Sequence, residues 1–110
     1  MIRRVATLAE ATIVLETHPA DPVELWSPEN AAEVQGVLWF VMLQRALGSA
    51  FPGRELPLVL DCGNRGDLAI EAFRHGLKDV ALTASESVMA KVAGVAAHCG
   101  GRLVRNPDIP

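Results

Sequence analysis

The fold is decided by a stretch near the middle of the chain, LPLVLDCGNRGDLAIEAFRHG, residues 56–76. Residues 56–60 form an apolar run that is typical of a buried strand. Residues 61–67 carry two glycines among polar side chains, which indicates a tight turn. In residues 68–76 the apolar side chains recur with a helical period. A strand, a turn and a helix in this order form the repeating unit of a parallel α/β sheet.

The same order of elements recurs on both sides of this stretch. The pattern predicts strands over residues 2–6, 23–27, 56–61, 79–83 and 102–105. Helices are predicted over residues 8–17, 28–47, 68–76 and 86–99. We therefore expect a single α/β domain over residues 1–110, with alternating β-α units and a parallel sheet of about five strands. A flavodoxin-like open sheet is our first choice, and half of a (β/α) barrel completed by dimerisation is the alternative.

Two helix starts have capping signals. Thr7-Leu8-Ala9-Glu10 is a capping box, in which the threonine hydroxyl bonds the N3 amide and the glutamate reaches back. Ser85 is placed to cap the last helix in the same way. That helix has a core stripe at helical spacing, made of Val88, Val92, Val95, Ala96 and Cys99.

Composition excludes several classes of function. Hydrophobic residues make up 50% of the 110 residues, which supplies a core and argues against disorder. The net charge is −3 with no basic stripe, so we expect no nucleic-acid partner. The longest apolar run, residues 37–43, is too short to cross a membrane, and Glu10 interrupts any signal sequence, which predicts a cytoplasmic protein. The two cysteines lack metal-type spacing, and we predict no metal and no cofactor.

The loop after the third predicted strand is the candidate ligand site. Backbone N–H groups at a helix start attract anions, and ligands of parallel sheets bind beyond the carboxyl ends of the strands. We expect a phosphate or carboxylate of a small metabolite to be bound there by Gly63, Asn64, Arg65 and Gly66, with Thr83 and Ser85 as further donors. Asp61 and Cys62 are the reactive candidates, because a helix start near Arg65 favours a thiolate. The alternative for Cys62 is a buried, structural side chain.

The three histidines are predicted to lie far from this loop in the folded chain. His18, His75 and His98 each fall in the last turn of a predicted helix. A helix of ten residues is about 15 Å long, so these side chains belong at the opposite edge of the sheet from the loop. This placement argues against Cys-His or Ser-His catalysis and against a histidine-rich metal site.

Three strand ends suggest one family likeness. Asp61, Thr83 and Arg105 follow the third, fourth and fifth strands, and this set resembles the phosphoacceptor aspartate, the Ser/Thr and the lysine of response-regulator receiver domains. The resemblance implies a switch domain that is phosphorylated on Asp61. It is a degenerate likeness, since Ala6-Thr7 stands where the family has the acidic pair that holds Mg²⁺.

The second predicted helix contains an unbroken apolar run, VLWFVML, at residues 37–43. A helix that covers one face of a sheet should have an apolar stripe rather than a full belt. We therefore expect a second subunit or another protein to cover its outer face, through Val37, Trp39, Phe40, Met42 and Leu43.

The sequence does not determine a function. Our first hypothesis is a small domain without catalytic activity that acts by homo-oligomerisation or partner binding. The alternatives are a binding domain or enzyme for a small anionic metabolite at residues 61–67, and a degenerate receiver-like switch.

Overall fold

The apolar run at the centre of the sequence forms the central strand of the sheet, β3 (Leu58–Asp61), whose four residues are all buried. The computed structural model describes residues 1–105. Four further strands pair with β3 or with its neighbours, each as predicted but shorter: β1 (Ile2–Arg4), β2 (Glu24–Trp26), β4 (Asp79–Ala81) and β5 (Arg102–Val104). All pairs are parallel, and the sheet has the order β1-β2-β3-β4-β5. The predicted α/β fold with an open parallel sheet of about five strands is confirmed.

Five helices connect the strands: α1 (Leu8–Thr17), α2 (Ala31–Val34), α3 (Val37–Ala50), α4 (Gly66–Arg74) and α5 (Glu86–Cys99). The capping box is confirmed at α1, where the Glu10 amide donates to Thr7 Oγ1 at 3.1 Å. The Glu10 carboxylate reaches back one residue further than the motif requires and accepts from the Ala6 amide at 2.8 Å. Ser85 caps α5, accepting from the Val88 amide at 3.4 Å.

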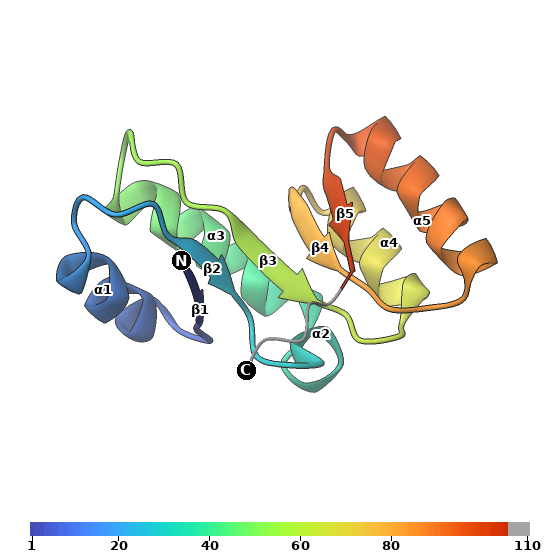
Figure 1. Cartoon of the computed structure of the whole chain (residues 1–110), viewed down its shortest axis with the longest axis horizontal. Coiled ribbons are helices and arrows are strands. Elements are labelled where there is room, and N and C mark those ends of the chain that lie inside the picture. Colours follow the sequence, from blue (N-terminus) through green and yellow to red (C-terminus); the bar gives the residue numbers. More distant parts are fainter. Residues whose placement is uncertain (106–110) are drawn as a thin grey trace.

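The sequential strand order determines where the helices lie. Each strand is added to the same side of the one before it. Right-handed crossovers then place all the connecting helices on one face of the sheet. In Figure 1 the four longer helices accordingly form one row, with α1 and α5 at its two ends and α3 behind β2 and β3, while the short α2 lies below the end of β3. The main core lies between this row and one sheet face, which contributes Leu25, Leu58, Leu60 and Val80. A half barrel has the same strand order, so that alternative stays a prediction.

The opposite sheet face is covered in a different way. Its apolar cluster consists of strand residues alone: Trp26, Val59 and Ala81, with Val104 packed against them. Charged side chains surround this cluster. Arg102 Nε lies 2.7 Å from Asp79 Oδ1 and its Nη2 lies 3.7 Å from Glu24 Oε2. Trp26 Nε1 donates to Glu24 at 2.8 Å, and Trp26 is only 3% exposed. The ion pairs of Arg102, and Arg4 at 5.7 Å from the centre of a Trp26 ring, thus place charged side chains beside this cluster.

The prediction of one helix over residues 28–47 is wrong. The segment forms the short α2 and then α3, separated at Gly36, whose φ of +96° belongs to the left-handed region that glycine adopts freely. Asn30 also has a positive φ, of 55°, and precedes α2. The break was missed because a single glycine in an otherwise helical pattern is a weak signal. α3 also continues through Gly48 to Ala50.

Two glycines provide a matched test of this packing. A Cβ at Gly101 would lie 2.6 Å from ring atoms of the buried Phe73 and 3.0 Å from the Lys78 carbonyl oxygen, whereas one at Gly48 would meet nothing within 4 Å. We expect Gly101→Ala to lower the free energy of unfolding by about 1–3 kcal/mol through overpacking. Gly48→Ala should raise it by about 0.5–1 kcal/mol because alanine favours a helix interior. Urea unfolding measures both, and a stabilised Gly101→Ala would contradict the packing of α4 against the start of β5.

Candidate functional site

The predicted ligand loop lies where β3 passes into α4, at the carboxyl edge of the sheet. The Thr83 amide donates to the Gly63 carbonyl oxygen at 2.8 Å, so the structure brings Thr83 beside the loop as expected. Ser85 instead caps α5, and Asn64 is exposed. Gly66 is required by packing, since a Cβ there would lie 2.7 Å from Val88 Cγ1 on α5.

Arg65 already holds two carboxylates. Its Nε and Nη2 donate to the two oxygens of Asp67 at 3.0 and 2.8 Å, and its Nη1 donates to Glu33 Oε1 at 3.0 Å. These partners raise the pKa of the guanidinium and lower that of Asp67. The Gly63 amide is likewise engaged, donating to Asp61 Oδ1 at 2.9 Å. An incoming anion would have to displace these contacts, and the anion site stays a prediction.

Cys62 is buried, at 1% exposure, in a negatively charged environment. Burial, together with the nearby carboxylates of Asp61, Asp67 and Glu71, raises the pKa of its thiol to about 12. We expected a helix start and Arg65 to favour the thiolate, but burial and the carboxylates act in the opposite direction. At neutral pH the side chain is a protonated thiol, which is a poor nucleophile.

Among residues 1–105, Asp61 is the one charged residue that is buried, at 2% exposure. Its Oδ2 lies 3.6 Å from Arg4 Nη1, which also donates to the Ser27 carbonyl oxygen at 2.7 Å. Ser27 Oγ accepts from the Asp61 amide at 2.8 Å. This cluster joins the ends of β1, β2 and β3. The sequence pattern indicates neither partner of Asp61, because Arg4 and Ser27 lie far from it along the chain. A buried carboxylate needs a cation and hydrogen-bond donors, and Arg4 supplies the cation.

The receiver-like set is arranged differently from what the resemblance implies. Arg4 is the cation beside Asp61, whereas Arg105 Nη2 pairs with Glu86 Oε1 at 2.8 Å. Thr83 is exposed and contacts the loop through its amide. The switch hypothesis stays a prediction that rests on the sequence pattern alone.

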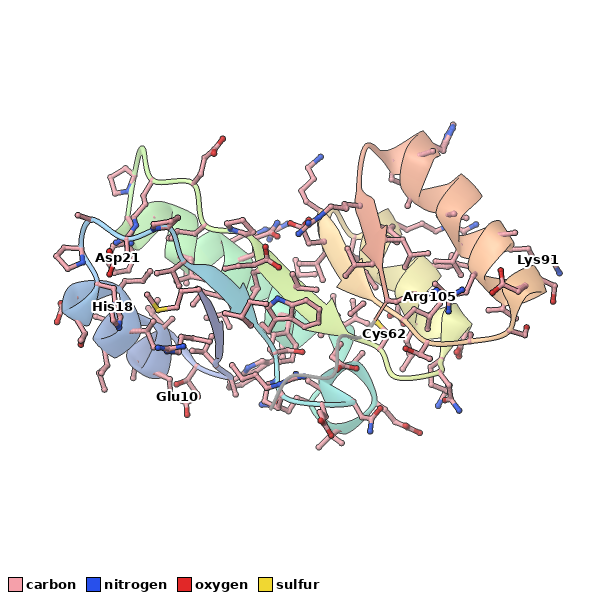
Figure 2. The ribbon with its side chains drawn as sticks, in the orientation of Figure 1. Glu10, His18, Asp21, Cys62, Lys91 and Arg105 are labelled. Atoms are coloured by element: carbon pink, nitrogen blue, oxygen red, sulfur yellow. The ribbon has the colours of Figure 1, made fainter. Side chains whose placement is uncertain are left out.

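The histidines lie at helix ends, as predicted. His18 and His75 are the C-cap residues of α1 and α4, and His98 lies in the last turn of α5. Figure 2 shows His18 beside Asp21 at the far end of the molecule from Cys62, and His18 Nδ1 lies 3.1 Å from Asp21 Oδ2. Within residues 1–105, no group of three or more His, Cys, Asp or Glu side chains is arranged to hold a metal ion.

The apolar run of α3 divides between the core and the surface. Val37, Phe40 and Leu43 are at most 6% exposed and pack inside this chain, so they offer little surface to a partner. Trp39 and Met42, by contrast, are 49% and 60% exposed. They border a groove of about 480 Å³ between α1 and α3, which we call the α1–α3 groove and which is lined by Thr7, Leu8, Ala9, Trp39, Met42, Leu43 and Ala46.

Trp39 is fixed in position at this groove. Its Nε1 donates to the Ala6 carbonyl oxygen at 2.6 Å, so the polar atom of the ring is satisfied while the apolar ring remains accessible. A half-exposed tryptophan held in one place is the type of side chain that anchors protein interfaces.

The environment of Cys62 leads to a pH prediction. Its thiol stays protonated in the folded chain up to a pKa of about 12 and ionises near 9.0 when unfolded, so the folded state binds more protons between these values. Stability should therefore fall as the pH rises above about 9, with a slope of up to about 1.4 kcal/mol per pH unit. In Cys62→Ala this part of the slope should vanish, which urea unfolding between pH 8 and pH 11 would measure. Rapid labelling of native Cys62 by a thiol reagent at pH 8 would contradict the burial.

The engagement of Arg65 leads to a second prediction. Because Asp67 and Glu33 occupy the guanidinium, we expect inorganic phosphate to stabilise the wild type no more than chloride does at equal ionic strength. Differential scanning fluorimetry of the wild type and Arg65→Ala makes the comparison. A phosphate-specific rise in Tm that disappears in Arg65→Ala would instead support the anion site at residues 61–67.

Comparison of the chain with protein-family models, with curated protein sequences and with solved structures finds no match. None of the helices in residues 1–105 is long and apolar enough to cross a membrane. The inference of function therefore depends on the geometry of the loop and of the α1–α3 groove.

Proposed function

We propose that this domain acts by protein association through the α1–α3 groove and carries out no catalysis of its own. The observation that supports this proposal is the exposure of Trp39 and Met42 at an uncharged groove. Exposed apolar surface costs roughly 25 cal/mol per Å², and contiguous patches of it mark binding sites.

The groove has the character of an interface centre. Its seven lining residues carry no charge, and the core of a typical protein interface is depleted of charged residues and enriched in Trp and Met. Two of the lining residues, Ala9 and Ala46, are small, which leaves room in the groove for a side chain of a partner. The groove favours an apolar protein surface over a polar metabolite.

The loop at residues 61–67 supplies little chemistry in comparison. The thiol of Cys62 is protonated and buried, Asp61 is paired with Arg4, and Arg65 is held by carboxylates. Asp61 and Arg65 thus already have structural partners, and Cys62 is buried. This arrangement supports an association domain over an enzyme.

Site-specific photo-crosslinking in the cells that produce the protein tests the proposal. Replacing Trp39 by benzoylphenylalanine places a photoreactive group in the α1–α3 groove, and Ile13, which is 67% exposed on α1, provides the control position. We expect ultraviolet light to give a protein adduct from position 39 and none from position 13. The adduct should be lost when Met42→Glu is added, because a carboxylate in an apolar interface is strongly unfavourable.

Two results would contradict the proposal. Equal adduct yields from positions 39 and 13 would show that the crosslinks report random encounters. No adduct from position 39 in any growth condition would show that the groove has no protein partner.

A further inference from the structure

We propose that the occupant of the α1–α3 groove is a second copy of this chain, forming a two-fold dimer. The inference rests on the proposed function and identifies its partner. In this dimer Met42 of each copy lies in the groove of the other.

The surface of α3 has the shape that such a dimer requires. At 100° per residue, Leu38, Met42 and Trp39 fall within one arc of about 100°, so they form a continuous ridge along the outer side of the helix. Their exposed fractions are 58%, 60% and 49%. The α1–α3 groove runs directly beside this ridge, because Trp39 and Met42 also line it.

A ridge next to a parallel groove is self-complementary. A two-fold axis that runs parallel to α3, between the ridge and the groove, relates the two copies. Rotation about this axis places the ridge of each copy in the groove of the other. Isologous interfaces of this kind use the same patch on both subunits. The small side chains of Ala9 and Ala46 in the groove provide the space for the partner's Met42.

The charge distribution also favours a second copy. Each chain has a net charge of −3, so two copies repel one another wherever their acidic residues approach. The α1–α3 groove has no charged lining residue, and the exposed tip of its ridge is apolar. The groove lining therefore places no acidic residue between two identical acidic chains, and the one charged residue of α3 is the exposed cation Arg45.

The exposed apolar area fits a stable dimer. The large apolar residues that are exposed on the groove or the ridge are Leu8, Leu38, Trp39 and Met42. Their exposed fractions lie between 37% and 60%. Together they expose roughly 450 Å² per copy, which matches the apolar share, a little over half, of the about 800 Å² that each partner contributes to a standard interface.

Sedimentation equilibrium on the full chain, from about 1 to 200 µM, tests the dimer. We expect the wild type to show a concentration-dependent dimer. Met42→Glu should raise the dissociation constant at least about 100-fold, because it buries two like charges in an uncharged interface. Ile13→Glu makes the same type of change at an exposed site outside the groove and should leave the dissociation constant unchanged.

A second variant tests the groove without adding charge. Ala46→Phe fills the groove from within and should raise the dissociation constant as Met42→Glu does. Circular dichroism and urea midpoints of each variant, taken at a concentration where the wild type is monomeric, establish that the fold is intact.

The results separate this inference from the proposed function. A wild type that is monomeric up to 200 µM, or a dimer that persists in both Met42→Glu and Ala46→Phe, would overturn the two-fold dimer at this groove. If the adduct from position 39 then has the mass of this chain plus another protein, the association function stands with a different partner. A monomer without any such adduct overturns both.

Discussion

The structure depends on one constraint, which is that strands laid down in sequence order with right-handed crossovers place every helix on the same face of the sheet. The chain therefore builds one core, between that face and the helix row, from the strand residues that alternate with Trp26, Val59 and Ala81. Parallel sheets are normally covered on both faces. Here the second face carries a small apolar cluster around Trp26, with the ion pairs of Arg102 to Asp79 and Glu24 beside it.

Carboxylate side chains determine the electrostatic environment at the carboxyl edge of the sheet. Asp61 is buried and held by Arg4 and by hydrogen bonds around Ser27, which couples the ends of three strands. Removing one partner of such a buried pair leaves an uncompensated charge and is strongly destabilising. Burial and the same concentration of negative charge raise the pKa of Cys62, and the carboxylates of Asp67 and Glu33 hold Arg65. These carboxylates thus explain why the loop contains little free positive charge, although its sequence pattern indicates an anion site.

The helix row determines which apolar residues remain for a partner. α3 packs against α1 on one side and α4 on the other, and the sheet covers its inner face, so Val37, Phe40 and Leu43 are buried. The outer arc with Leu38, Trp39 and Met42 stays exposed, beside the start of α1. The break at Gly36 contributes to this arrangement, because it allows α3 to start in a new direction after α2. The apolar belt of the sequence thus becomes a buried stripe beside an exposed ridge.

The sequence by itself determined the features that depend on neighbouring residues. These are the alternation of strands and helices, the caps at Thr7 and Ser85, and the positions of His18, His75 and His98 at helix ends. Only the tertiary structure decided the order of the strands, the pairing of Arg4 with Asp61, the capture of Arg65 by Glu33, and the division of α3 into buried and exposed sides. The physical reason is range. Caps and periodicity act within one or two helical turns, whereas Arg4 and Asp61, or Glu33 and Arg65, are brought together only when the whole sheet has formed.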